Sequence, residues 1–161
     1  MPIAVLFVCM GNHCRSPAAH AVAQHVAAAE GLSNIVFDSA GTTGHHRGDH
    51  PHPLATAEGA RRGYRVNHIG RLIHPDDFAR FDMILVMDWL TMRALQNIAP
   101  EQYRHKIELV MRYAQNSDDA EIPDPFYLEQ EAFNQAVDYM EDAALGLLDL
   151  VKRRLPQPVA A

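Results

Sequence analysis

The stretch that decides the fold is IAVLFVCMGNHCRSP, residues 3–17. Residues 3–8 are uniformly apolar, which is typical of a strand buried on both faces of a parallel sheet. Ser16 and Pro17 then lead into an alanine-rich segment with helical spacing, and a Ser cap followed by Pro is a helix start signal. We therefore expect a strand over 3–8, a loop that opens on Cys9, and a helix over about 16–29.

The loop between this strand and this helix has the composition of an anion-binding site. Free backbone N–H groups and the positive end of the helix dipole meet at a helix N-terminus, where they bind phosphate-like anions. The same place favours the thiolate form of a cysteine. Cys9 opens the loop and Arg15 closes it, with five residues between them. This spacing predicts a thiolate nucleophile at the floor of an oxyanion cradle and a guanidinium at its rim.

Apolar strands and amphipathic helices alternate along the rest of the chain. We expect further strands over 34–39, 83–87 and, more weakly, 107–110, and helices over 54–62, 75–79, from the third strand to about 96, and 128–155. This alternation predicts an α/β fold of three layers, with a parallel sheet covered by helices on both faces. Ligands of such sheets bind at the carboxyl ends of the strands. Cys9 is predicted to lie at such an end.

Length, charge and cysteine content narrow the class of protein. The chain has 161 residues and a net charge of −6. We expect one domain over 1–155 and a flexible tail over 156–161. The acidic charge argues against nucleic acid as a partner. No apolar run has the length of a membrane span, no signal peptide is recognisable, and two cysteines do not form a disulfide framework. We therefore expect a cytoplasmic protein without membrane insertion, as a monomer or weak dimer.

Four segments in chain order resemble the low-molecular-weight protein tyrosine phosphatases. They are VCMGNHCRSP (8–17), DSAGT (38–42), FDMILVMD (81–88) and IPDPFY (122–127). The resemblance covers nearly the whole chain, and the first and last segments together are strongly specific. It implies a four-stranded parallel sheet flanked by helices. It also implies a hydrolase that releases inorganic phosphate from phosphotyrosine in a protein substrate, with no metal and no other cofactor.

The resemblance assigns the chemistry to three residues. The Cys9 thiolate attacks phosphorus and forms a phosphocysteine, which divides the hydrolysis into two easier displacements. Arg15 binds two phosphate oxygens with its planar fork. Asp124 protonates the leaving oxygen and later acts as a base toward water, in a loop stiffened by Pro125. The alternatives are a buried structural thiol, a surface arginine and an ordinary Asp-Pro turn.

The resemblance also implies residues that support the site. Ser16 donates a hydrogen bond to the thiolate, although it also fits a simple helix cap. Asn12 braces the loop, with Ser39 and His68 as its expected partners. The phosphate-binding loop itself comprises Met10, Gly11, Asn12, His13, Cys14 and Arg15.

Two more predictions concern redox chemistry and the pocket wall. Cys14 is the expected partner of Cys9 in a reversible disulfide, or else a packed thiol with no redox role. His45, Phe126 and Tyr127 are expected to form the wall of a cleft that fits an aryl ring.

Several histidines depart from the family pattern and leave the substrate open. His13 stands where the family often has Ile or Thr, and His45 where it often has an aromatic residue, usually Trp. His20 stands where many members have an acid, and His52-Pro53-Leu54 where the family often has Asp-Pro-Arg. Phosphoarginine therefore remains an alternative to phosphotyrosine. The histidines at 45, 46, 50 and 52 raise the question of a metal site, but their Gly/Pro-rich setting favours a solvated rim loop.

Other functions fit the same residues less well. An arsenate reductase of this fold needs further cysteines to relay a disulfide, and none follows Cys14. A phosphate-binding module without activity needs no general acid, so the presence of Asp124 beside the loop motif counts against it. A metal-binding protein built on the His-rich loop is the remaining alternative.

Overall fold

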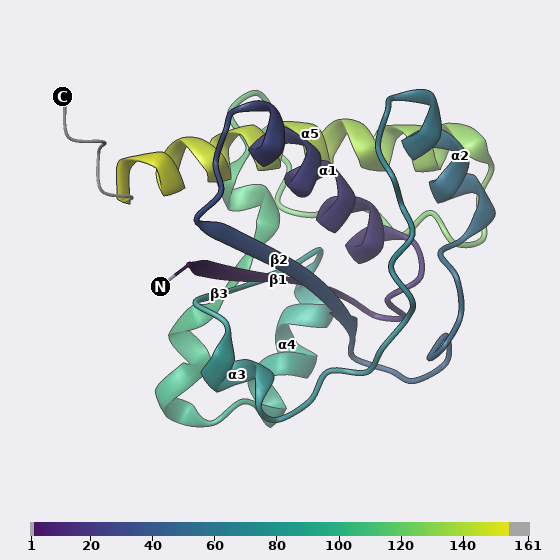
Figure 1. The fold of residues 1–161 in the computed structure, drawn as a ribbon. Helices are drawn as coiled ribbons and strands as arrows, with labels where there is room; N and C mark the ends of the chain where they lie inside the picture. The colour runs from purple at the N-terminus through teal and green to yellow at the C-terminus, as the bar shows by residue number, and fades with distance from the viewer. Residues whose placement is uncertain (1, 155–161) are drawn as a thin grey trace, which may run out of the picture.

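The computed structural model describes residues 2–154. Its elements in chain order are β1 (Ile3–Cys9), α1 (Arg15–Ala29), β2 (Ile35–Gly41), α2 (Pro53–Arg61), α3 (Asp77–Arg80), β3 (Met83–Val86), α4 (Trp89–Ile98), the 3₁₀ helix η1 (Glu101–Lys106), β4 (Ile107–Leu109), the 3₁₀ helix η2 (Val110–Tyr113) and α5 (Gln130–Arg154) (Figure 1). The tail predicted over 156–161 lies outside the described residues.

The four strands form one parallel sheet in the order β2-β1-β3-β4. In its register, Val5 of β1 pairs with Phe37 of β2 on one side and with Met83 of β3 on the other. The predicted four-stranded parallel sheet is therefore confirmed. The chain leaves β1 toward β2 and later crosses to β3, so the carboxyl end of β1 lies at the point where the strand order reverses. Open α/β sheets bind their ligands there.

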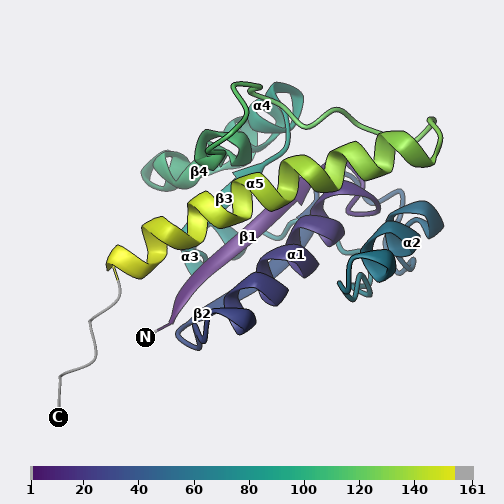
Figure 2. The same cartoon turned by 90° about the horizontal axis from the view of Figure 1, so that it is seen from above.

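Helices cover both faces of the sheet, as Figures 1 and 2 show: α1, α2 and α5 lie on one side, and α3 and α4 on the other. Val5, Phe7 and Cys9 of β1 belong to the core under α1 and α5. Leu6 and Val8 belong to the core on the α3–α4 side. Alternate residues of a strand point to opposite faces, so a strand covered on both faces needs the unbroken apolar run of residues 3–8. Among residues 2–154, no helix is long and apolar enough to cross a membrane.

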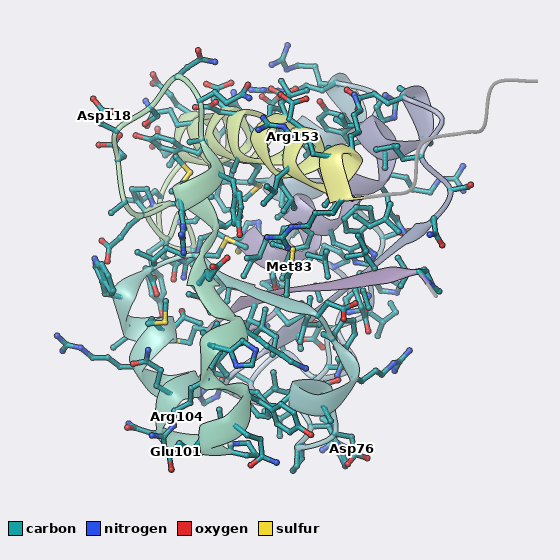
Figure 3. All side chains as sticks on the ribbon, turned by 90° about the vertical axis from the view of Figure 1, so that its left-hand side faces the viewer. Asp76, Met83, Glu101, Arg104, Asp118 and Arg153 are labelled. Atoms are coloured by element: carbon teal, nitrogen blue, oxygen red, sulfur yellow. The ribbon has the colours of Figure 1, made fainter. Side chains whose placement is uncertain are left out.

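Charged side chains lie at the surface of the fold, and apolar ones lie inside it. Figure 3 shows the charged side chains of Asp76, Glu101 and Asp118 at the periphery, and Met83 toward the interior.

Helix α5 runs back along the sheet, so that β1 begins and α5 ends on the side away from the carboxyl end of β1 (Figure 1).

The boundaries differ from the predictions in two instructive places. Helix α1 begins at Arg15, with Cys14 rather than Ser16 in the cap position, and no side chain caps it. The prediction of Ser16 as the cap was wrong because its hydroxyl is turned toward Cys9. Strand β4 is shorter than predicted, because the chain turns into η2 at Val110.

Candidate active site

A cleft of about 340 Å³ opens at the carboxyl end of β1. It brings together residues of the loop after β1, of the His-rich loop and of the loop before α5. The lining residues are Cys9, Met10, Gly11, His13, Cys14, Arg15, Thr43, His45, His46, Asp124, Phe126 and Tyr127. Residues more than a hundred positions apart in the sequence therefore meet in one pocket.

Cys9 is the last residue of β1 and is almost fully buried. Its Sγ atom lies 3.0 Å from the Oγ atom of Ser16, and the backbone N–H of Ser16 donates to the same sulfur at 3.4 Å. Both contacts come from the first turn of α1, where the helix dipole is positive. Ser16 and the N-terminus of α1 therefore lie directly against the sulfur.

Asn12 connects the phosphate-binding loop to the sheet. Its backbone is left-handed, with φ of 52°, a conformation that Asn tolerates better than most residues. Its Nδ2 atom donates to Ser16 Oγ at 2.8 Å and to Ser39 Oγ at 3.1 Å. Its Oδ1 atom accepts from the backbone N–H of Arg71 at 2.9 Å. Asn12 therefore joins α1, β2 and the segment before α3.

The end of β2 fits closely under this loop. A Cβ atom on Gly41 would lie 2.9 Å from backbone atoms of Met10, Gly11 and Asn12. Backbone N–H groups of Thr42 and Thr43 donate to the carbonyls of Cys9 and Met10 at 3.0 and 2.9 Å. The absence of a side chain at Gly41 is thus a condition of this close approach.

His68, an expected partner of Asn12, lies further from the loop. The ring that contacts Ser39 is that of His20, whose Nδ1 atom lies 3.4 Å from Ser39 Oγ. His68 packs edge-on against His20, with ring centroids 5.2 Å apart, and its Nδ1 atom lies 3.7 Å from Asp38. The departure at His20 was visible in the sequence, but its contact with Ser39 was not predicted.

Arg15 lines the cleft but is buried, with 2% of its surface exposed, so the guanidinium does not lie at the rim as predicted. Its Nη1 atom donates to the Asp88 carboxylate at 2.7 Å and to the carbonyl of Ile122 at 2.9 Å. Its Nη2 atom lies 3.7 Å from the carboxylate of Asp124. Burial lowers the pKa of Arg15, but the negative charges of Cys9, Asp88 and Asp124 raise it on balance. The guanidinium is therefore a permanent cation.

Asp88 is a site residue that the sequence reasoning missed as an individual. It follows β3 and caps α4, accepting from the N–H of Thr91 at 2.8 Å. Burial raises the pKa of Asp88. The hydrogen bonds from Thr91 and Arg15 lower this pKa by more than burial raises it, so the net shift is downward. Asp88 ends segment 81–88 and comes just after β3, the strand beside β1. This position at the carboxyl end of a strand could have indicated a site residue from the sequence.

Asp124 lies at the mouth of the cleft, with 46% of its side chain exposed. Its Oδ1 atom accepts from the backbone N–H of Phe126 at 3.1 Å. This short turn leaves the second carboxylate oxygen directed to the Arg15 side. A solvent-accessible carboxyl therefore lies at the same cleft as Cys9 and Arg15.

Histidines and an aromatic ring form one wall of the cleft. The rings of His13 and His46 stack in parallel, with centroids 3.8 Å apart, and Phe126 lies 5.9 and 5.5 Å from them. Burial first, and then the neighbouring His46 and His52, lower the pKa of His13. The wall is therefore aromatic, and burial favours the neutral form of its His13 ring. His45 lines the cleft as expected, whereas the stacking of His46 on His13 was not predicted.

The His-rich loop does not gather its imidazoles around one point. The Nδ1 atom of His46 lies 3.1 Å from Asp49, and His52 Nδ1 accepts from Leu54 N–H at the start of α2. Among residues 2–154, three metal-ligating side chains converge elsewhere, at His20, Asp38 and His68.

Cys14 is buried beside the cleft as a free thiol. Burial, followed by the negative charges of Cys9 and Asp124, raises its pKa to about 12. Cys14 is therefore a neutral thiol at physiological pH, and its pairing with Cys9 under oxidation stays a prediction.

The fold and the site together define a class of enzyme: a cysteine-based phosphatase, with its thiol at the end of the central strand of a parallel sheet and an arginine behind it. The family model of the low molecular weight phosphotyrosine protein phosphatases matches residues 4–157. The chain belongs to this family.

Individual relatives agree with this assignment. A putative low molecular weight protein-tyrosine-phosphatase of Synechocystis is 42% identical over 94% of this chain and 98% of its own. A protein tyrosine phosphatase of Entamoeba histolytica has a similar solved structure, with a TM-score of 0.91 and 37% identity over 95% of this chain and 99% of its own. The YwlE arginine phosphatase is also similar, with a TM-score of 0.86 and 27% identity over 96% and 100% of the two chains.

Proposed function

We propose that this enzyme hydrolyses phosphotyrosine in proteins through a phosphocysteine on Cys9. One observation carries the proposal: a buried thiol that receives two contacts from Ser16 shares a single cleft with the Arg15 guanidinium and the Asp124 carboxyl. The solved YwlE structure, from a Cys-to-Ser mutant with a phosphorylated active-site serine, supports a covalent intermediate on this scaffold.

In the first step the Cys9 thiolate attacks phosphorus. The S–P bond forms while the bond from phosphorus to the phenolic oxygen breaks, and Asp124 transfers its proton to that oxygen. Arg15 and the backbone N–H groups of the loop hold the phosphoryl oxygens, where phosphoryl transfer depends mainly on positioning and electrostatic stabilisation.

In the second step water hydrolyses the phosphocysteine. Asp124, now a carboxylate, accepts a proton from the water as its oxygen attacks phosphorus. The P–S bond breaks, inorganic phosphate leaves, and the Cys9 thiolate is restored with the help of the Ser16 donors. This sequence balances protons and electrons without a metal ion or a redox cofactor.

The wall of the cleft favours an aryl leaving group. The planar stack of His13 and His46 and the ring of Phe126 offer aromatic faces to a phenyl ring. Phosphoarginine is the second candidate, because His13 adds a polar ring to the loop and because the arginine phosphatase YwlE is structurally similar. A turnover assay with phosphotyrosine, phosphoarginine and phosphoserine peptides in EDTA separates these candidates. Preference for phosphotyrosine supports the proposal, and preference for phosphoarginine overturns its substrate assignment.

The nucleophile is tested by Cys9→Ser. We expect this variant to lose turnover on phosphotyrosine peptide, because an alcohol at this position is far less ionised than a thiol. Urea unfolding and circular dichroism establish that the variant is folded. Turnover like that of the wild type in a folded Cys9→Ser protein would refute the phosphocysteine.

The general acid is tested by Asp124→Ala. We expect a loss of about 10²-fold or more in kcat/KM, which reports the steps up to phosphocysteine formation, on aryl phosphates with poor leaving groups and a much smaller loss on good ones, since these depart without a proton. Asp118→Ala is a matched control, because Asp118 is an exposed aspartate outside the cleft. Equal losses on both kinds of substrate would remove Asp124 from this role.

A further inference from the structure

Three side chains with metal-binding groups meet beside β2, an edge strand of the sheet, outside the lining of the active-site cleft. His20 comes from α1, Asp38 from β2, and His68 from the segment between α2 and α3. One ligand atom from each of the three lies within 4.8 Å of the other two. Three different elements thus place two imidazoles and a carboxylate around one point.

The two imidazoles have hydrogen-bonding capacity that the protein does not use. The Nε2 atoms of His20 and of His68 are both buried and have no hydrogen-bond partner within residues 2–154. Buried polar atoms are nearly always paired, and those that are not need an explanation, such as an ion. A ligand bound by these rings would satisfy them.

Both rings are held in the form that binds metals. Burial, followed by the charge of His68, lowers the pKa of His20 from 6.5 to about 4. Burial also lowers the pKa of His68, against an opposing effect of Asp38. Neutral imidazoles keep a lone pair for a metal ion, so no proton has to be displaced at neutral pH.

The charges around the cluster leave room for a cation. Arg71 donates to Asp38 at 3.0 Å and to Asp77 at 2.9 Å, so two carboxylates share one guanidinium. With neutral imidazoles, the net charge of this group is −1. The Oδ1 atom of Asp38 accepts from the backbone N–H of Ser39 at 2.8 Å and retains a further lone pair.

We propose that His20, Asp38 and His68 bind a zinc ion, with a fourth position open to water. Two imidazoles and one carboxylate suit zinc, whereas magnesium and calcium prefer oxygen ligands alone. Zinc–ligand bonds of about 2.0–2.2 Å require the ligand atoms to lie well inside the 4.8 Å limit within which they fall here.

The zinc site is linked to the phosphate-binding loop through one hydroxyl. Ser39 Oγ lies 3.4 Å from Nδ1 of His20 and accepts from Asn12, which braces the loop. Zinc that reorients His20 therefore acts on the loop without entering the cleft. We therefore expect zinc at this site to change kcat.

The experiment measures zinc binding by isothermal titration in a Cys9→Ser protein, which lacks the catalytic thiol as a competing ligand. We expect one zinc per chain, and at least tenfold weaker binding after His20→Gln or His68→Gln. His25→Gln is the matched control, since His25 is an exposed histidine of the same helix that packs against Tyr64 instead. The control is expected to bind zinc like its parent.

Two outcomes would overturn the site. They are absence of zinc binding in the parent and unchanged binding in folded His20→Gln and His68→Gln proteins. Circular dichroism of each variant shows whether it is folded. Because the readout is binding rather than turnover, failure here leaves the proposed phosphatase reaction untouched.

Discussion

The residues of the site fall into two groups: some are close together in the sequence, and others are far apart in the sequence and meet only in the folded protein. Cys9 and Arg15 belong to one contiguous loop motif, which made both predictable from the sequence. Asp88 and Arg71 reach the same loop from distant segments, and no local pattern marks their contacts. His46 was noted only as part of a polar loop, because its stacking on His13 depends on how that loop folds back.

At the residue scale, Asp88 is expected to position Arg15. In Asp88→Asn the amide oxygen still accepts from Thr91 and caps α4, but the charged hydrogen bond to the guanidinium is lost. A charge-assisted hydrogen bond contributes roughly 1.5–3 kcal/mol, and only part of this energy serves to orient the Arg15 guanidinium. We therefore expect kcat to fall about tenfold. Steady-state kinetics with an aryl phosphate measures the effect.

Thr91→Val is the control for this variant. It removes a hydroxyl that donates to the other oxygen of Asp88 and leaves the Arg15 contact in place. We expect lower stability and a kcat within about twofold of the wild type. A similar loss of kcat in both variants would show that the charged contact between Asp88 and Arg15 is not what sets kcat.

At the scale of elements, the order and type of the predicted helices and strands agree with the structure, whereas their ends do not always agree. Periodicity reports which face of an element is buried, so the long amphipathic pattern predicted α5 well. The 3₁₀ helices η1 and η2 carry no such periodic pattern. The start of α1 was misplaced because Ser16 is used by the thiol, a contact between elements that local rules do not contain.

One buried carboxylate joins α2 to α5. Glu58 has 1% of its side chain exposed and pairs with Arg61 at 2.5 Å and Arg62 at 2.7 Å, and Arg62 also contacts Asp138 and Glu141 of α5. The hydrogen bond from Arg61 is the largest effect and lowers the pKa of Glu58. Burial raises this pKa and Arg62 lowers it, so that the pKa falls to about 2 on balance. Glu58 is therefore ionised in the folded protein at every physiological pH.

We expect Glu58→Gln to lower the free energy of unfolding by about 2–3 kcal/mol at pH 7, because it leaves Arg62 without its buried partner. A carboxyl with a lowered pKa stabilises the fold above its unfolded pKa, near 4.5, and this effect is lost as the pH falls toward about 2. The difference between variant and wild type is therefore expected to shrink over that range. Urea unfolding at pH 7 and at several values below 4.5 measures it, and a constant difference would contradict this explanation.

At the scale of the whole molecule, four histidines share one property. Burial is the first cause that lowers the pKa of each of them: His13, His20, His52 and His68. In the unfolded chain these imidazoles take up protons near pH 6.5, whereas in the folded protein they do so only at lower pH. The unfolded state therefore binds more protons in this range, and the stability of the protein must rise with pH.

We expect the free energy of unfolding to fall as the pH is lowered from about 6.5 to about 4, the interval between the ordinary and the folded pKa of His20. His20→Gln is expected to flatten part of this slope. Urea unfolding with EDTA present, so that metal binding does not contribute, measures both proteins. A slope that is unaffected by the substitution would assign the pH dependence to other groups.

The direction of α5 has a practical consequence for handling the enzyme. Because β1 begins and α5 ends on the side of the molecule away from the cleft, a surface or probe tethered next to either element faces the opposite way from the pocket mouth. Immobilised on a sensor through such a tether, the protein presents its cleft outward to a large phosphoprotein. Attachment through the His-rich loop would instead place the tether at the rim and obstruct docking.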